Sequence, residues 1–445
     1  MIEILSIINN ISFYRDGESL ESIPEDICTL LKKVGLIEDV ASSSELKRIN
    51  KTSISFCGLL YGENSIYVFL PKCHPIPESL ELGKKVVREL MSCISNYCLD
   101  HGNSIHDLSD IGQVGVVRQI PLYKSIIDDY IKYGLFRSRI KQSKRNGVGK
   151  IDWAKTIKTL PYITSHHKQR IVYSEFVTEN FSYSSETIIA NIHAAIINEI
   201  DQKYGWWFTD NASGRIASEL SFYHLNGVDR GMLSNILKKE LRGTFNERLI
   251  RLLKNLISYL EYDSAIFSKG VEICGISKFE LLWERMLLEV LKPTAVDLKA
   301  MLPVPAYRTG SGKLSLLKTK KGRIDIIIKE GDVVAIIDAK YYNAYDVSCS
   351  PGWPDLVKQF FYEKLVASID NKLSIGNFFI LPNANTFSRP EQGLIARVQD
   401  EMVEVLSDIF PPVNCIYVCP QELICNYNNK KLDSKLRKRI ISMVS

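Results

Sequence analysis

Two acidic residues and one lysine are spaced for shared chemistry within residues 322–342, GRIDIIIKEGDVVAIIDAKYY. Asp325 stands at the start of one β-branched, apolar run, and Asp338 and Lys340 stand at the end of a second. Such runs on either side of a Gly331-Asp332 pair are typical of a β-hairpin with a two-residue loop. In that register Asp325 lies directly opposite Asp338.

Side-chain alternation adds the lysine to the two acids. Successive side chains of a strand point to opposite faces, so Asp338 and Lys340 share a face and Ala339 points away. The two acids and the lysine therefore converge on one face of a mostly apolar hairpin. Stability alone does not explain this cluster, because charge in an apolar setting costs free energy.

The chemistry that suits these residue types is phosphodiester hydrolysis. Two neighbouring carboxylates repel, and a hard divalent cation offsets the repulsion. Ligands that are all oxygen select Mg²⁺ over zinc, and Mn²⁺ is expected to substitute for it. Such a cation orients and activates a water, and a nearby lysine assists water deprotonation or stabilises the developing negative charge.

The order D-x(12)-D-x-K in this segment resembles the pattern of the PD-(D/E)XK nuclease superfamily. Ile324 is a departure, since that superfamily often has proline there. The resemblance implies that Asp325 and Asp338 hold Mg²⁺, with the Ala339 carbonyl as a further ligand. It also implies that Lys340 orients or activates the attacking water, and that cleavage leaves a 5′-phosphate.

The same resemblance assigns roles in the two flanking helices. The acid of the preceding helix falls in FELLWERML, where we expect Glu284 as a metal ligand and catalytic residue, with Glu280 as the reserve choice one helical turn away. A surface position is the alternative for Glu284. The following helix matches PGWPDLVKQFFYEKLV, in which Gln359 and Tyr362 share a face. We expect Gln359 to contact a phosphate or a water, or else to brace the sheet.

A closer resemblance joins LLWERML, RIDIII…VAIIDAKYY and PGWPDLVKQFFYE to the LlaJI-type restriction endonucleases, relatives of the McrC subunit of modification-dependent restriction. FCGLL (56–60), YVFLPK (67–72) and GKIDWAKTI (149–157) are weaker matches. The resemblance implies a type II-like or modification-dependent deoxyribonuclease. It would be the nuclease component of a bacterial restriction or anti-phage system, acting on double-stranded DNA beside an McrB-like AAA+ GTPase.

The sequence has no G-x-x-x-x-G-K-[ST] motif, so a nucleotide-hydrolysing motor would be another chain. Its nearest fragment, Gly310–Lys313, is expected to be a flexible loop. Two other functions stay open. One is a catalytically silent DNA-binding or motor-docking subunit with a nuclease-like fold, and the other is a structure-selective DNA repair nuclease.

The elements that position these residues indicate an α/β C-terminal core, a mixed sheet flanked by helices, after a mixed α+β N-terminal region. We expect an N-terminal region at 1–160 for DNA positioning or partner docking, a mainly helical connection at 161–264, and a PD-(D/E)XK nuclease domain at 265–445. The spacing of apolar residues predicts strands at 323–329, 333–341, 377–381 and 414–419, and a hairpin over 54–71. It predicts helices at 25–36, 80–100, 186–204, 230–262, 279–291, 354–369 and 391–409. Thr244 and Glu247 match a capping box within 230–262.

A basic stretch from Lys132 to Lys150 contains no acidic residue and ends in a glycine-containing loop, SKRNGVGK. Basic side chains in such a stretch suit contacts with DNA phosphates. A solvated loop that touches nothing is the alternative. The residues that we expect to bind DNA are Arg137, Arg139, Lys141, Lys144 and Arg145.

The bulk properties are those of a globular protein that acts in the cytoplasm. Net charge is +5, which permits a nucleic-acid partner without requiring one. No segment has the length of apolar sequence that spans a bilayer, so we expect no membrane contact, and residues 1–10 do not match a signal peptide. The ten cysteines form no CxxC pair and are expected to be reduced core thiols, and the seven histidines lack ligand spacing. Oligomeric state stays open.

Overall fold

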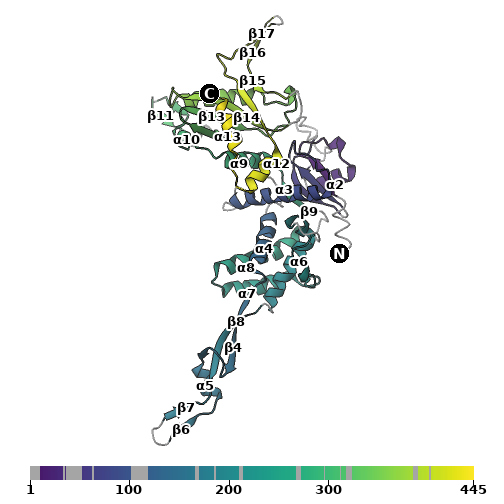
Figure 1. Ribbon diagram of the computed structural model, residues 1–445, viewed down its shortest axis with the longest axis vertical. Coiled ribbons are helices and arrows are strands. Elements are labelled where there is room, and N and C mark those ends of the chain that lie inside the picture. Colours follow the sequence, from purple (N-terminus) through teal and green to yellow (C-terminus); the bar gives the residue numbers. More distant parts are fainter. Residues whose placement is uncertain are drawn as a thin grey trace. The chain divides into compact units, whose positions relative to one another are not determined.

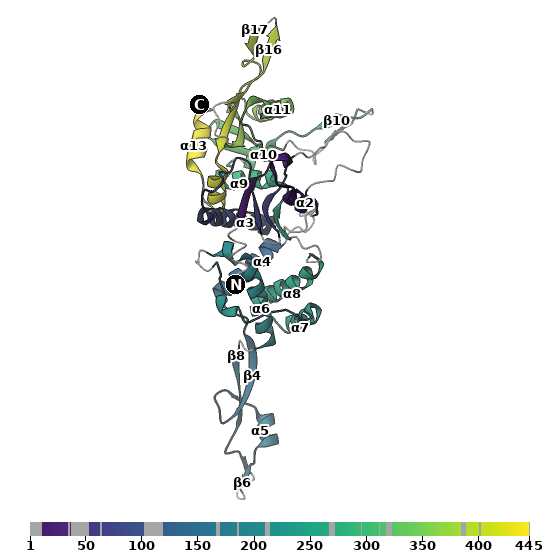
Figure 2. The ribbon, with the colours of Figure 1, turned by 90° about the vertical axis from the view of Figure 1, so that its right-hand side faces the viewer.

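The structure is a computed structural model that describes residues 11–33, 36, 53–62, 65–101, 119–165, 170–184, 187–209, 214–266, 272–294, 296–310, 312–316, 323–383, 389–399 and 402–444. Residues 1–10, which do not match a signal peptide, lie outside these ranges. Two of the seven histidines, His166 and His167, also lie outside them. The chain has the expected mixed α/β composition. Contacts divide it into two compact units, unit 1 with residues 1–121 and 269–445, and unit 2 with residues 122–268 (Figures 1 and 2). The expected segment 1–160 thus contributes to both units.

The first sheet of unit 1 joins three strands from the first 70 residues to one strand that follows unit 2 in the sequence. Its strand order is β1-β3-β2-β9. The predicted hairpin over 54–71 is confirmed, because β2 and β3 pair antiparallel. Gly58 of β2 has φ +146°, and a Cβ there would lie 2.2 Å from the Cys274 carbonyl oxygen of β9, so only glycine lets these two strands approach. The elements are β1 (Ile11–Arg15), β2 (Cys57–Tyr61), β3 (Ile66–Leu70) and β9 (Glu272–Ile276), with α2 (Glu25–Lys33) and α3 (Leu80–His101).

The second sheet of unit 1 carries the predicted hairpin. Its strand order is β12-β13-β14-β18-β15, with antiparallel outer pairs and parallel inner pairs. The strands are β12 (Ile326–Glu330), β13 (Val333–Ala339), β14 (Ser374–Pro382), β15 (Gln392–Gly393) and β18 (Val413–Val418). The helices around it are α9 (Phe279–Leu291), α10 (Val296–Met301), α11 (Trp353–Ala367), α12 (Pro420–Asn428) and α13 (Ser434–Ser442). The predicted helices at 279–291 and 354–369 and the four predicted strands are confirmed.

Helix α11 covers the face of β13 that bears the cluster. Val334 and Ile336 of β13 belong to one buried apolar cluster with Tyr362 and Val366 of α11. Because side chains alternate, Asp338 points to this same face. The helix thus brings its own polar residues to the end of β13.

The predicted helix at 391–409 is wrong. The segment forms β15, β16 (Ala396–Gln399) and β17 (Met402–Val405), and β16 pairs with β17 so that Val398 lies opposite Val403. All the side chains of β16 and β17 are exposed. With no apolar surface to cover, the helical spacing gains nothing from burial, and the β-branched residues favour strands. Figures 1 and 2 both show this hairpin projecting from unit 1.

Unit 2 is a helical core that carries a β-ribbon (Figures 1 and 2). Asn246, rather than Thr244, caps α8, since the Leu249 N–H donates to the Asn246 side chain at 3.2 Å while the Thr244 hydroxyl donates to the Glu240 carbonyl. The predicted capping box is therefore wrong. The helices are α4 (Gln119–Tyr133), α5 (Trp153–Thr159), α6 (Ile188–Phe208), α7 (Arg230–Arg242) and α8 (Glu247–Ile266). The strands are β4 (Ser138–Arg145), β5 (Lys150–Ile151), β6 (Ile163–Ser165), β7 (Arg170–Val172) and β8 (Val177–Ser184).

The structure also bears on the expectations for membrane segments, for the cysteines and for the Gly310–Lys313 fragment. No described helix is long and apolar enough to cross a membrane. All ten cysteines are free thiols, and five of them, Cys57, Cys93, Cys98, Cys274 and Cys415, are buried. The Gly310–Lys313 fragment connects β10 (Ala306–Arg308) to β11 (Leu314–Leu316), which pair antiparallel.

Candidate active site

The hairpin register brings the two aspartates together. β12 and β13 pair from Ile326↔Ile337 to Glu330↔Val333, around a loop in which Gly331 has φ +60°. This is the predicted register, and it sets Asp325, one residue before β12, opposite Asp338. The backbone N–H of Ala339 donates to Asp325 Oδ2 at 3.0 Å, which fixes the carboxylate beside β13.

Lys340 joins the pair as the alternation predicts. Its Nζ lies 2.7 Å from Asp338 Oδ2. Its backbone N–H donates to the Ile380 carbonyl at 2.9 Å and extends the ladder between β13 and β14. Asp338 is 2% exposed, so this ion pair is largely removed from water.

Helix α11 adds two charged residues to the site. Lys358 Nζ lies 2.8 Å from Asp338 Oδ1, and Asp355 Oδ1 lies 2.5 Å from Lys340 Nζ. The site is therefore a chain of alternating charges from Lys358 through Asp338 and Lys340 to Asp355. The sequence predicts no chemical role for Asp355, and it marks Lys358 only as part of the matched segment Lys358-Gln359-x-x-Tyr362. Their spacing of three residues on a helix, with Tyr362 a further turn on, is the signal that could have indicated a shared face.

The pKa values of the two aspartates are shifted in opposite directions. Burial and the neighbouring Asp338 carboxylate raise the pKa of Asp325 to about 7, and Glu284 adds to this rise. Burial also acts to raise the pKa of Asp338, but hydrogen bonding with Asp325, Lys340 and Lys358 outweighs it and lowers that pKa. Asp325 is thus the member of the pair that holds a proton near neutral pH.

Lys340 stays charged at neutral pH. Burial acts to lower its pKa, but the ion pairs with Asp338 and Asp355 outweigh burial and raise it. A lysine in this state donates hydrogen bonds and stabilises negative charge. It has no free lone pair with which to accept a proton.

The expected third acid lies near the pair without joining it in one cluster. Glu284 on α9 has a side chain 31% exposed and an oxygen 3.7 Å from Arg323 Nη2. Within the described ranges, no group of three or more His, Cys, Asp or Glu side chains is placed to hold a metal ion. Glu280, the reserve choice, is exposed and contributes instead to raising the pKa of Asp16. A metal role for Glu284 stays a prediction.

Gln359 and Tyr362 occupy the expected face of α11. Gln359 is fully buried, and neither polar atom of its amide has a hydrogen-bond partner in the described part of the chain. An unpaired buried amide is costly, so a polar group such as a water or a substrate atom is expected beside it. The Tyr362 hydroxyl donates to the Arg323 carbonyl and braces the backbone two residues before Asp325.

The donor set fits a hard divalent cation. Both candidate ligands, Asp325 and Asp338, offer carboxylate oxygens, which Mg²⁺ and Mn²⁺ prefer. Burial raises the pKa of Asp325 most, and hydrogen bonding with and repulsion by the neighbouring Asp338 carboxylate raise it further. An added cation would relieve this repulsion.

The five residues expected to bind DNA lie in unit 2. Four of the five lie in a strand rather than in a loop: β4 runs from Ser138 to Arg145, and only residues 146–149 separate it from β5. Arg137 and Lys144 are exposed, and Arg145 forms an ion pair with Glu175. The structure places Arg139 and Lys141 in β4 and does not describe their side chains. Their contact with DNA stays a prediction.

Comparisons with known proteins agree with the resemblance drawn from the motifs. The type II restriction enzyme BsuMI component YdjA of Bacillus subtilis (strain 168) is 23% identical over 274 residues, which cover 57% of this chain and 56% of that protein. The match therefore spans little more than half of that relative's length.

Two solved structures are also similar in part. One is a half-complex of Thermococcus gammatolerans McrB AAA+ hexamers with bound McrC, at TM-score 0.40 and 14% identity, covering 95% of this chain and 99% of that chain. The other is the Thermococcus gammatolerans McrBC complex, at TM-score 0.29 and 14% identity, covering 62% and 86%. A family model described as LlaJI restriction endonuclease matches residues 56–391, which is most of the chain and includes Asp325, Asp338 and Lys340. The chain belongs to the LlaJI restriction endonuclease family.

Proposed function

We propose that this chain is a Mg²⁺-dependent DNA endonuclease of the PD-(D/E)XK type and the nuclease component of a bacterial restriction system. The observation that carries the proposal is the convergence of Asp325, Asp338 and Lys340 at one end of the β12–β13 hairpin. Family membership supports the restriction role. The sheet order β12-β13-β14-β18, with α11 packed over the aspartates, supports the PD-(D/E)XK assignment of the 265–445 segment.

In the proposed site, Asp325 and Asp338 would hold the cation, and the Ala339 carbonyl and Glu284 would be the further protein ligands. When bound, Mg²⁺ or Mn²⁺ supplies Lewis-acid activation of a water and charge stabilisation at the scissile phosphate. Asp325 must lose its proton to act as a ligand, since its pKa is raised to about 7.

Lys340 acts as a cation and hydrogen-bond donor in this site. Asp338 and Asp355 hold its ammonium group, so it is placed to orient the attacking water and to stabilise charge that develops on the phosphate. The buried Gln359 amide is the group that we assign to a phosphate oxygen or to the water. The products are a 5′-phosphate and a 3′-hydroxyl end.

One observation favours the silent-subunit alternative. Asp338 already contacts two ammonium groups, Lys340 at 2.7 Å and Lys358 at 2.8 Å, and such a network can be purely structural. In that case the chain would bind DNA or dock a motor without cutting. No observation separates out the repair-nuclease alternative.

The partner that we propose is a separately encoded McrB-like AAA+ GTPase. Two points support it: membership of the LlaJI family, and the absence of a Walker A motif from this sequence. The relative YdjA is itself described as a component of a restriction enzyme. The substrate would be double-stranded DNA in the cytoplasm, and the β4–β8 ribbon carries the basic residues proposed to contact its backbone.

The test is plasmid cleavage by the wild type and by Asp338→Ala, in Mg²⁺ or in EDTA. Half of the reactions would contain a cognate AAA+ GTPase and GTP, on methylated and unmethylated DNA. We expect cutting that requires metal and is lost in Asp338→Ala while DNA binding is retained. Tight DNA binding without cutting under every condition would favour the silent subunit.

A further inference from the structure

The two lysines beside Asp338 are held in different ways. Lys340 Nζ pairs with Asp338 at 2.7 Å and with Asp355 at 2.5 Å, and the Lys340 side chain is 12% exposed. Lys358 Nζ pairs with Asp338 at 2.8 Å, and the Lys358 side chain is 37% exposed. Among the residues that the structure describes, Lys358 has no other acidic partner. Lys340 is therefore fixed from two sides, whereas Lys358 can leave its place with the loss of one ion pair.

The carboxylate that holds Lys358 is also a proposed ligand of the cation. Each oxygen of Asp338 has an ammonium nitrogen beside it, Lys358 at Oδ1 and Lys340 at Oδ2, and Asp338 is 2% exposed. A metal cation and an ammonium group on the same carboxylate repel each other, and this repulsion is strong where water is excluded. Because Asp355 retains Lys340, Lys358 is the group that must leave when Asp338 binds a cation.

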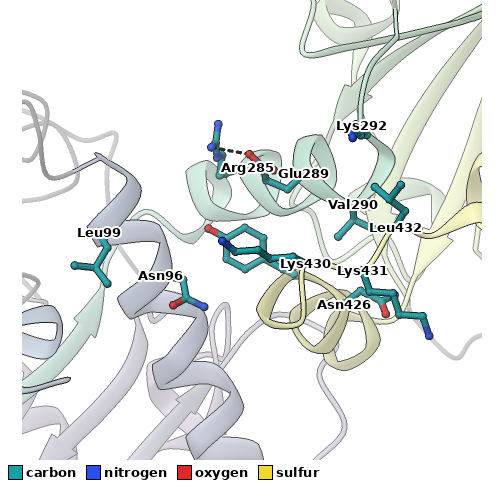
Figure 3. A pocket seen from close by; sticks show the side chains of 11 residues that line it. Asn96, Leu99, Arg285, Glu289, Val290, Lys292, Asn426, Lys430, Lys431 and Leu432 are labelled. Carbon is teal, nitrogen blue, oxygen red and sulfur yellow. Dashed lines mark ion pairs between the residues drawn. The ribbon is translucent and has the colours of Figure 1, made fainter. Parts of the chain in front are cut away.

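Basic residues at the other concavity of unit 1 show the contrast. Arg285, which lines the pocket between α3, α9 and α12, pairs with Glu289 at 2.6 Å (Figure 3). Lys292 and Lys430 also line this pocket and follow the C-terminal ends of α9 and α12, where the negative helix ends compensate their charges. The groups that compensate these charges have no proposed ligand role, whereas the partner of Lys358 has one.

The net charge of the site indicates where Lys358 goes. The charged side chains of the site are Asp325, Asp338, Lys340, Asp355 and Lys358. With every carboxyl group ionised, the acidic groups exceed the basic ones by one charge, and the Glu284–Arg323 pair adds one charge of each sign. A divalent cation turns this into an excess of one positive charge, and one phosphodiester group restores neutrality. Since net charge in a largely buried site costs free energy, the cation and a phosphate stabilise each other there.

Lys358 is the residue that creates this dependence on phosphate. Without its charge, a divalent cation alone would neutralise the site, and no displaced ammonium group would need a new partner. The ammonium group ends a flexible four-carbon stem and is a compact charge that binds phosphate oxygens. Its partly exposed position allows contact with a phosphate that approaches from solvent.

We propose that Lys358 makes cation binding at Asp338 depend on a DNA phosphate. In the free chain the Lys358 ammonium group occupies Asp338 Oδ1. On DNA it transfers to a phosphate oxygen, and Asp338 is released to bind the cation. The inference rests on the proposed nuclease function and adds a regulation of the same site, because the cation is held firmly only where there is a phosphate to cut.

The experiment is fluorescence anisotropy on the full chain, which measures the dissociation constant of labelled short duplexes of mixed sequence. Each variant is titrated in EDTA and in saturating Mn²⁺ at equal ionic strength, at about pH 8, where carboxyl groups are ionised. The ratio of the two dissociation constants is the coupling factor, which by linkage is also the factor by which DNA tightens Mn²⁺ binding. The AAA+ GTPase is left out and a denaturing gel verifies that the DNA stays intact, and Ca²⁺, which oxygen ligands also bind, replaces Mn²⁺ if the gel shows cutting.

Four variants are compared with the wild type. Lys358→Met removes the charge, Lys358→Arg keeps it, and Lys364→Met, at an exposed lysine of the same helix, is the matched control. Asp338→Ala removes the proposed ligand and gives the background effect of Mn²⁺ on DNA binding. We expect the wild-type coupling factor to exceed that of Lys358→Met by about fivefold or more, with Lys358→Arg and Lys364→Met within about twofold of the wild type. Lys358→Met keeps the direct attraction between cation and phosphate, so its factor should stay above that of Asp338→Ala.

Equal coupling factors in the wild type and Lys358→Met would overturn the proposal and leave Lys358 as a structural partner of Asp338. A loss in Lys358→Arg as large as that in Lys358→Met, an equal loss in Lys364→Met, or failure of the duplexes to bind would overturn it as well. A wild-type factor no larger than that of Asp338→Ala would contradict the cation site itself, and with it the nuclease proposal.

Discussion

At the scale of single residues, the site is a problem of charge balance. Asp338 is held by two lysines, whereas Asp325 lies beside the Asp338 carboxylate and accepts a hydrogen bond from the Ala339 N–H. In the proposed site, binding of the cation and binding of a proton would therefore compete at Asp325. One prediction concerns the proton on Asp325, and a second concerns the affinity of the site for a cation.

The first prediction concerns the stability of the metal-free protein. Folding raises the pKa of Asp325 from the ordinary 3.8 to about 7, so the folded state binds this proton more tightly than the unfolded state. The protonated Asp325 carboxyl therefore contributes fully to the free energy of unfolding below about pH 4, and this contribution is lost as pH rises through about 7. Asp325→Asn removes this dependence. In EDTA, the melting temperature of the wild type should fall between pH 4 and pH 7 relative to that of the variant, and parallel curves would contradict the assignment.

The second prediction concerns Lys358, whose ammonium group competes with a cation for Asp338. Lys358→Met should raise Mg²⁺ or Mn²⁺ affinity by about threefold to tenfold, because the site gains net negative charge. Isothermal titration calorimetry with Mn²⁺ measures the change. Lys364→Met, an exposed lysine on the same helix, is the control and should leave affinity unchanged. Weaker metal binding by Lys358→Met would show that Lys358 organises the ligands instead.

At the scale of elements, the end of β13 is tied to the first sheet of unit 1. The Tyr341 hydroxyl accepts from the Lys72 backbone N–H at 2.8 Å and also bonds the buried Asp16 carboxyl. Tyr341 is 5% exposed and follows Lys340 directly. The first sheet thus helps to fix the strand end that carries the lysine.

Tyr341→Phe should leave the Lys72 N–H and Asp16 with one partner fewer. Unsatisfied buried groups of this kind reduce the free energy of unfolding by about 1–3 kcal/mol. Urea denaturation of the full chain measures the loss. Tyr307→Phe removes an exposed hydroxyl from the same unit and should change stability little. Equal stability of the two variants would argue that the Tyr341 contacts carry no net energy.

The elements also show which features a sequence can predict. The hairpin register follows from Gly331-Asp332 and from the alternation around it, which are local, so Asp325 and Asp338 could be paired in advance. The contacts of Asp355 and Lys358 depend on how α11 packs over β13, which no local pattern encodes. The helix predicted at 391–409 is wrong for the opposite reason: its helical spacing is visible, but residues 396–399 and 402–405 in its middle are exposed and have no apolar surface to cover.

At the scale of the whole molecule, the segment proposed to be the nuclease domain has partners in the N-terminal part of the chain. β9 completes the first sheet by pairing with β2, and the Asn428 amide of α12 donates to the Glu89 carbonyl of α3 at 2.8 Å. Residues 1–121 and 269–445 accordingly form one unit, and unit 2 is inserted between them in the sequence. The sequence allows only three consecutive segments to be predicted. The pairing of β9 with β2 is a long-range contact that leaves no local pattern, so a unit made of two separate segments could not be predicted.

A fragment of residues 265–445 should therefore be less stable than the full chain. It loses the strand partner of β9 and the support of α3 under α12. Limited trypsin digestion should degrade it about tenfold faster or more, since cleavage follows the population of opened states. Residues 1–121 joined to 269–445 through a flexible linker should recover resistance. A fragment as resistant as the full chain would favour the boundary at 265.

The most direct measurement is the rate of supercoiled plasmid cleavage in Mg²⁺, with the cognate AAA+ GTPase and GTP under conditions in which the wild type cuts, by Asp338→Asn beside Asp332→Asn. Both variants exchange one carboxylate for an amide on the same hairpin, but Asp332 lies in the exposed loop, away from the cluster. We expect a loss of about 10³-fold or more for Asp338→Asn and a wild-type rate for Asp332→Asn. Equal rates for the two variants would contradict a nuclease site at Asp325, Asp338 and Lys340.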